Sequence, residues 1–227
     1  TAENRGLELS LQYRNNDRPL KYGVGGNVAF VRNEVTGLGR GNEPVLSGYV
    51  QSANANASKT DVGHPIASFF GYVTDGIFQN QREVEAAAFQ SNETAPGDIR
   101  FKDLDGNGVI DANDRTFIGN PTPALAYGMN LDLSWRNFDL NLFWQGTHGN
   151  DIYVNTTRFD FNFVNRPASA LQRWTGEGTS NTEPRVRLDD PNQNARISDR
   201  FVQDGSYLRL KTLQLAYNFP TKWLQKA

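Results

Sequence analysis

Five segments of this chain alternate between apolar and polar residues with a period of two, the pattern of β-strands that hide one face from water. The third is the clearest, because Tyr127, Leu131 and Trp135 fall on one face and Asn130 on the other. The pattern predicts an all-β fold built from antiparallel strands. The five segments run from 7 to 14, 22 to 30, 127 to 135, 138 to 145 and 212 to 219.

The alternation of the last segment slips near Lys211. Leu213 and Leu215 lie on one face of an ideal strand, whereas Leu208 and Leu210 lie on the other. An extra residue in one strand produces such a slip, so we expect either a β-bulge at this point or the edge of a membrane.

Two features favour a transmembrane β-barrel over a soluble β-sandwich. Aromatic residues stand at the strand ends, as in Tyr127 with Trp135 and Phe138 with Trp144, and aliphatic residues fill the middle. Rings of this kind prefer the interface between lipid and water. The polar face carries Asn, Asp, Ser, Gln and Gly, which suits a wet lumen. The pattern therefore predicts one part of a large antiparallel transmembrane barrel.

The connections between these strands alternate in length. Residues 15–20 and 136–137 are short links, whereas residues 37–123 and 147–204 are long insertions. Outer-membrane barrels have short periplasmic turns and long extracellular loops. We therefore expect residues 1–227 to be a single barrel segment with two extracellular loops.

An acidic loop within the first insertion, residues 103–114, has the spacing of a calcium-binding loop. Oxygen ligands are expected at positions one, three, five, seven, nine and twelve, and Gly108 occupies position six, where the turn is sharp. The closing residue is Asp114 rather than Glu, which predicts a weak structural site with a Kd of roughly 10⁻⁴–10⁻³ M. The alternative is a cluster of Asp-Gly and Asn-Gly turns. The expected ligands are the side chains of Asp103, Asp105, Asn107, Asp111 and Asp114 and the carbonyl of Val109.

Three further elements are expected in the first insertion. Residues 99–102 alternate like a short strand, and Gln81 to Gln90 have the spacing of a short amphipathic helix. Residues 52–59 are polar and weakly patterned, so we expect them to be mobile.

Composition narrows the function further. The net charge of -2 gives no attraction to nucleic acid, and the chain has no cysteine. Mean hydropathy is -0.61, and no apolar run reaches the length of a transmembrane helix. His64 and His148 are far apart in sequence and accompany no nucleophile motif. We therefore expect that the chain is not an enzyme.

Four stretches stand out along the chain: GHPIASFFGYVTDGIFQ at 63–79, PGDIRF at 96–101, IGNPTP at 118–123 and DGSYLRLK at 204–211. In this order they resemble motifs of the SusC/RagA-type TonB-dependent outer-membrane transporters. The dipeptides Trp174-Thr175 and Pro184-Arg185 fit the same family.

The resemblance implies a barrel of about 22 strands with a plugged lumen in the bacterial outer membrane. It implies import of an oligosaccharide or a peptide, driven through TonB, with a SusD/RagB-type surface lipoprotein as a lid. The chain lacks a signal, a TonB box and a plug, so we expect it to be a late-barrel fragment whose strands face membrane lipid.

Tyr72 and Trp174 are candidates for contact with substrate or with the lid, although local loop packing also explains such aromatics. A second interpretation of the whole chain is a soluble, secreted, calcium-stapled β-sandwich that binds a glycan. The two interpretations differ in whether the apolar strand face meets lipid or a protein core.

Overall fold

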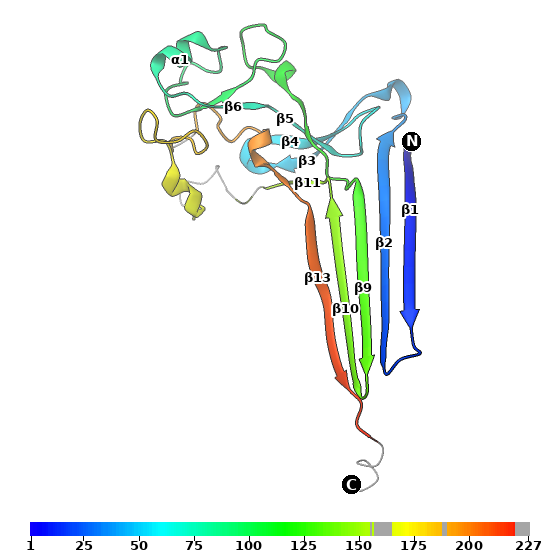
Figure 1. The fold of residues 1–227 in the computed structure, drawn as a ribbon. Coiled ribbons are helices and arrows are strands. Elements are labelled where there is room, and N and C mark those ends of the chain that lie inside the picture. Colours follow the sequence, from blue (N-terminus) through cyan, green and yellow to red (C-terminus); the bar gives the residue numbers. More distant parts are fainter. Residues whose placement is uncertain (155, 157–164, 188–189, 221–227) are drawn as a thin grey trace. The chain divides into compact units, whose positions relative to one another are not determined.

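The computed structural model describes residues 1–154, 156, 165–187 and 190–220 (Figure 1). They form two compact units. The sheet unit comprises residues 2–34, 122–151 and the described residues from 204 onward; the inserted unit comprises Thr1 and residues 35–121 and 152–203. None of the helices in these ranges has the length and apolar character needed to cross a membrane.

The sheet unit is one layer of five long strands in the order β1-β2-β9-β10-β13. The pairs β2–β9, β9–β10 and β10–β13 are antiparallel. Each predicted strand is present and begins at or before its predicted first residue, and only the last ends earlier than predicted. The strands are β1 (Ala2–Asn15), β2 (Leu20–Val35), β9 (Leu125–Trp135), β10 (Phe138–His148) and β13 (Tyr207–Tyr217).

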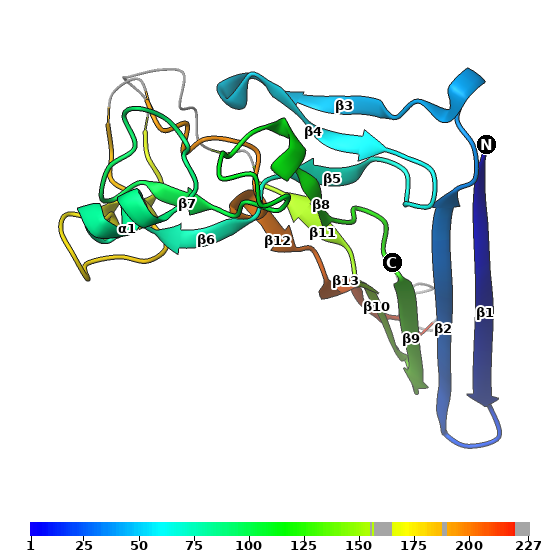
Figure 2. The ribbon, with the colours of Figure 1, turned by 90° about the horizontal axis from the view of Figure 1, so that it is seen from above.

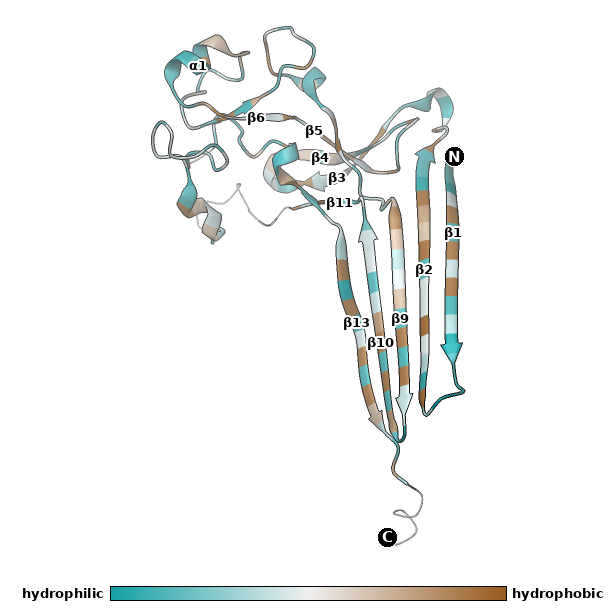
Figure 3. Cartoon of the chain, viewed as in Figure 1, coloured by the Kyte–Doolittle hydropathy of each residue, from teal (hydrophilic) through white to brown (hydrophobic). Residues whose placement is uncertain are grey.

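The register of these strands places their apolar residues in common rows. Leu131 of β9 pairs with Val24 of β2 and with Leu142 of β10, and Leu142 pairs in turn with Leu213 of β13. Because side chains alternate along a strand, one such row means that the other apolar residues share the same face. Figure 3 shows apolar (brown) and polar (teal) residues following one another along these strands.

The apolar face has aromatic residues near the end with the short links. Trp135 pairs with Phe138, and the rings of Phe138 and Tyr217 lie 4.8 Å apart. Nearer the other end, the hydroxyl of Tyr127 donates to the carbonyl of Tyr207. Tyr127 and Trp135 are separated by about 27 Å at the usual rise of a strand.

The predicted bulge lies between β10 and β13. Phe143 pairs with Thr212 and Trp144 pairs with Leu210, so Lys211 has no partner in the ladder. The extra residue restores the phase of the strand: Leu208 and Leu210 point to the same face as Leu213. The slip in the sequence pattern is therefore absorbed locally and does not expose an apolar row on the polar face.

The polar face is built around side-chain amides and carboxylates. Asp132 accepts hydrogen bonds from the amides of Asn130 and Asn141, which lie on the same strand and on its neighbour. Asn130 lies against Gly25 of β2, where a Cβ atom would collide with its amide. Glycine at position 25 therefore makes room for a polar side chain on this face.

The inserted unit contains a four-stranded sheet in the order β3-β4-β5-β8 and a two-stranded sheet of β6 and β7 (Figure 2). A separate pair is formed by β11 and β12. The strands are β3 (Val45–Val50), β4 (Ala55–Thr60), β5 (Ser68–Gly71), β6 (Thr74–Ile77), β7 (Ile99–Phe101), β8 (Thr116–Gly119), β11 (Asp151–Tyr153) and β12 (Val202–Asp204). The helices are α1 (Gln81–Ala86) and the 3-10 turns η1 (Arg40–Asn42), η2 (Gln51–Ala53), η3 (Ala112–Asp114), η4 (Ala168–Gln172) and η5 (Asp199–Phe201).

Two small apolar clusters stabilise the inserted unit. One contains Val50, Ala57 and Ile197, and the other contains Ile99 and Phe101 together with Ile110 of the acidic loop. Each cluster joins residues from separate stretches of the chain. The acidic loop is therefore anchored to the unit by an apolar side chain.

Two expectations for the inserted unit are wrong. Residues 52–59 were expected to be mobile, but residues 55–60 form β4, which pairs with β3 and β5, and Ala57 is buried. The helix that begins after Asn80 is shorter than predicted: Asn80 caps it by accepting from the Glu83 amide, but it ends at Ala86. Phe89, predicted as helical, instead pairs with Val109 in a β-bridge.

Candidate functional site

The acidic loop brings three of its predicted ligands together. Carboxylate oxygens of Asp103, Asp105 and Asp114 lie within 4.8 Å of one another. The carboxylate of Asp111 is not part of this group and accepts a hydrogen bond from the Asn113 amide at 2.7 Å. Asn107 accepts through Oδ1 from the Val109 amide. The three grouped carboxylates suit a hard cation that prefers oxygen, such as Ca²⁺.

Backbone amides hold the carboxylate of Asp103 in place. Gly108 donates to it at 2.8 Å and Gly106 at 2.7 Å. These bonds, that from Gly108 foremost, hold the pKa of Asp103 below its ordinary value. Both glycines adopt positive φ, +75° at Gly106 and +83° at Gly108, a conformation in which most other residues are strained.

Asp114 closes the loop from within the protein. Its side chain is fully buried and accepts hydrogen bonds from the amides of Leu104 and Asp111. On the other side of the loop, the Phe89 amide donates to the carbonyl of Gly108, and the Ile110 amide donates to the carbonyl of Phe89. Hydrogen bonds therefore hold the loop both at its middle and at its closing residue.

The two aromatic candidates of the sequence lie in different surroundings. The Tyr72 ring lies 5.6 Å from the Phe101 ring, and the guanidinium carbon of Arg196 lies 5.4 Å from the Tyr72 centroid. Burial lowers the pKa of Arg196. Trp174 donates its indole N–H to Gln79 at 3.2 Å and packs closely on Gly97. Both rings are half-buried, and their contact with a substrate or lid stays a prediction.

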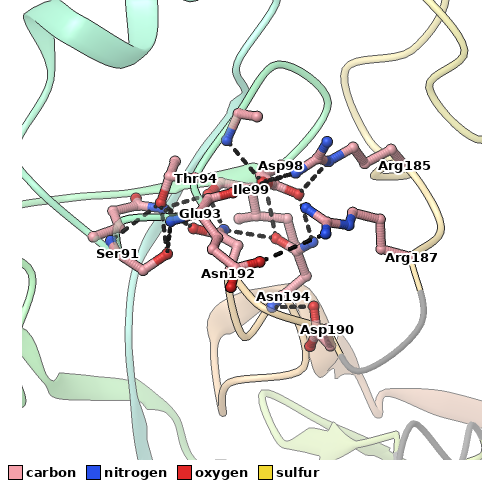
Figure 4. Close-up of polar contacts among 12 residues, drawn as sticks. Ser91, Glu93, Thr94, Asp98, Ile99, Arg185, Arg187, Asp190, Asn192 and Asn194 are labelled. Carbon is pink, nitrogen blue, oxygen red and sulfur yellow. Dashed lines mark hydrogen bonds and ion pairs between the residues drawn. The ribbon is translucent and has the colours of Figure 1, made fainter.

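A buried polar network joins the two long insertions, and sequence reasoning missed it (Figure 4). Asp98 is 1% exposed and accepts from Arg185 through Nε at 2.8 Å and through Nη2 at 2.7 Å. Asn194 donates to Asp98 at 3.1 Å and accepts from the Ile99 amide at 2.9 Å. The buried carboxylate thereby gains both a charged partner and an amide partner.

Side-chain amides also complete the hydrogen bonding of β7. Gln90 accepts from the Phe101 amide at 2.7 Å and donates to the Ile99 carbonyl, to which Asn192 also donates. These amides replace a neighbouring strand at a buried edge. The only sequence signal is the density of polar residues near Asn192, which is equally typical of an exposed loop.

The chain resembles known proteins over nearly all of its length, although no family model matches it. It is 34% identical to TonB-dependent receptor P3 of Formosa agariphila over 99% of this chain. It is 26% identical to TonB-dependent receptor SusC of Bacteroides thetaiotaomicron over 98% of this chain. The chain spans 22% and 21% of these relatives, respectively.

The fold matches that of a solved structure, the RagAB peptide transporter, with a TM-score of 0.71 and 20% sequence identity. The match covers 97% of this chain and 23% of the solved chain. The sheet unit thus has the fold of a wall segment of an antiparallel β-barrel, and its described strands form an open sheet. Over nearly its whole length, the chain is homologous to a segment of the SusC/RagA-type TonB-dependent receptors of the bacterial outer membrane.

Proposed function

We propose that the full-length protein imports an oligosaccharide or a peptide across the outer membrane, using energy passed through TonB. The observation that carries this proposal is the sheet unit, whose strands have one face of aligned apolar rows and one face of amides and carboxylates. A transport barrel needs both faces, one for lipid and one for a wet lumen. The names of the relatives, TonB-dependent receptors and a peptide transporter, support the same function.

The soluble sandwich is the weaker alternative. In a sandwich, a second sheet packs on the apolar face. The described strands of the sheet unit form a single layer, and the side chains of Leu11 and Leu213 on its apolar face are 81% and 66% exposed. Lipid is the partner that suits such a surface.

We also propose that the acidic loop binds calcium as a structural ion. The ligands would be the grouped carboxylates of Asp103, Asp105 and Asp114, joined by Asn107, Asp111 and the carbonyl of Val109. Position nine of such loops often binds through water, which suits Asp111 because its carboxylate stands apart from the other three. The bound ion would offset the repulsion among these negative charges.

Both long insertions leave the same end of the sheet, because β2 and β10 end there and β9 and β13 begin there. We propose that this end is extracellular, as in barrels with long outer loops and short periplasmic turns. A SusD/RagB-like lipoprotein would then cover the inserted unit from outside the cell, where Tyr72 and Trp174 are candidates for contact.

Growth of the native bacterium tests the import function. A strain without the full-length gene should lose growth on at least one nutrient in a panel of polysaccharide digests and casein peptides. The intact gene should restore growth, and a strain without TonB should show the same deficit. Unchanged growth on every member of the panel would contradict the proposal.

A further inference from the structure

A cavity of about 290 Å³ lies within the inserted unit, between η4 and two stretches, residues 183–187 and 190–194. Its size is at the lower end of ligand pockets, enough for one sugar ring or one amino-acid residue. The lining combines apolar groups, such as Val154 and Phe201, with several charged side chains. The acidic loop does not line it, so the cavity is separate from the proposed calcium site.

Positive charge dominates the lining. Among the described residues that line the cavity are five arginines and two carboxylates, those of Glu183 and Asp190. Two of these arginines pair with carboxylates outside the lining, Arg185 with Asp98 and Arg187 with Glu93. The arginines are Arg166, Arg173, Arg185, Arg187 and Arg200.

Two of these arginines are held in fixed positions. Arg185 is paired through two nitrogens with Asp98, and Arg200 is paired with Glu183 at 2.6 Å. Each of the two side chains is 20% exposed. A guanidinium has five N–H donors in a rigid plane, so a carboxylate on one edge orients the other edge for a second acceptor.

Arg173 differs from these two. It donates weakly to the carbonyl of Ala170 at 3.4 Å and forms no ion pair with a residue in the described ranges. Its charge is therefore not offset by a protein carboxylate there. A positive field in a cavity attracts anions before contact and holds them after it.

We infer that this cavity binds an anionic group of a small solute, a carboxylate or a sulfate. The inference rests on the proposed function for its physiological meaning: the transported nutrient, a sugar or a peptide, would be acidic. The orienting arginines would fix the oxyanion, Arg173 would add net charge, and the apolar lining would contact the body of the solute.

Calorimetric titration of the detergent-purified full-length protein tests the site at constant ionic strength. The probes are sodium sulfate, sodium glucuronate and N-acetylglutamate, with glucose as the neutral reference. The three anions represent an inorganic anion, an acidic sugar and an acidic peptide, so their relative affinities show which kind of solute carries the anionic group. At least one anion should bind, and glucose should bind more weakly than it does.

Three variants sharpen the test. Arg173→Glu should raise the Kd of the anion about tenfold, because it reverses an uncompensated charge. Glu183→Gln should lower the Kd about threefold, because it removes an anion that competes for Arg200. Arg82→Glu makes the same charge change at an exposed position on α1, away from the cavity, and should leave the Kd unchanged.

Equal affinity in all four proteins, or no anion binding by any of them, would overturn the inference. If cells import nutrients but the purified receptor binds no anion, the anion site is contradicted and the proposed function stands. Loss of import on every nutrient, with anion binding preserved, would instead contradict the proposed function and leave the site.

Discussion

Single residues fix the inserted unit where apolar packing is sparse, and the pair of Asp98 with Arg185 is the clearest case. The Asp98 side chain is 2% exposed and that of Arg185 is 20% exposed. Breaking such a pair from one side leaves a buried charge without its partner, which costs about 3–5 kcal/mol. This value of about 3–5 kcal/mol is the cost of leaving one charge buried alone. Compared with two apolar residues of the same size, the intact pair stabilises the folded state by less than this.

Arg185→Ala should therefore increase hydrogen exchange in the peptide that contains Ile99 and Phe101 by at least about a hundredfold. Arg187→Ala provides the matched control, because Arg187 is 47% exposed and lies 3.5 Å from Glu93. An exposed pair of this kind contributes about 0–1 kcal/mol, so exchange should change little. Equal effects of the two variants would show that the buried pair does not hold this segment.

The acidic loop gives a second prediction at this scale. The full-length protein should bind Ca²⁺ with a Kd of roughly 10⁻⁴–10⁻³ M, measured by competition with terbium luminescence. Asp103→Asn should raise the Kd about tenfold or more, whereas Glu85→Gln on α1 should not. No change on Asp103→Asn would remove this carboxylate from the ligand set.

The same titration has an expected dependence on pH. Gly108 and Gly106 lower the pKa of Asp103, so its carboxylate stays ionised below the ordinary range of aspartate. Binding should therefore not change with pH near neutrality and should be lost only in acid, as the pH falls through the ordinary range of aspartate and then through the lowered pKa of Asp103. Loss of binding already near pH 6 would indicate a different ligand.

At the scale of elements, the aligned rows of the sheet assign each strand residue to lipid or lumen. Leu131→Arg should reduce barrel assembly, because arginine at the middle of the lipid face costs about 2–4 kcal/mol. Gln214→Arg is the control, since Gln214 pairs with Asn141 on the polar face at a neighbouring depth. Heat-dependent migration of the full-length protein on gels measures the folded fraction. Equal assembly of the two variants would contradict the assigned faces.

The bulge at Lys211 gives a sharper test of register. Deletion of Lys211 should be tolerated, because Leu210 can still pair with Trp144 in a regular ladder. Deletion of Asn141 should abolish assembly, because it turns one half of β10 over and moves its apolar residues to the polar face. If both deletions assemble equally well, strand register does not control folding here.

Some strands and helices could be predicted from the sequence and others could not. The long strands were predicted because their alternation is strong and local. β4 was missed because residues 55–60 contain only two apolar side chains, Ala55 and Ala57. Its pairing with β3 and β5 decides its conformation, and pairing is not visible in a local pattern. The predicted range of the helix α1 was too long for the same reason, because Phe89 forms a β-bridge with Val109.

At the scale of the whole molecule, the proposed topology makes the two ends of the sheet chemically distinct. Asn92→Cys lies in the inserted unit and Arg18→Cys lies in the short link between β1 and β2; both residues are exposed. An impermeant maleimide applied to intact cells should label the first and spare the second. Exposure decides the choice of position in the inserted unit, since Ser58 in β4, for example, is only 8% exposed and would not react. The reverse pattern would invert the topology.

The sequence alone determined the number of long strands, their faces, the place of the slip near Lys211 and the spacing of the acidic loop. These features depend on residues that are near one another in the chain, so periodicity and spacing carry them. Tertiary structure decided how the insertions fold. Asp98 and Arg185 are 87 positions apart, and Gln90 and Asn192 are 102 positions apart. Contacts over such distances satisfy buried polar groups through geometry that only the folded chain creates, because no local rule selects which distant amide completes a strand edge.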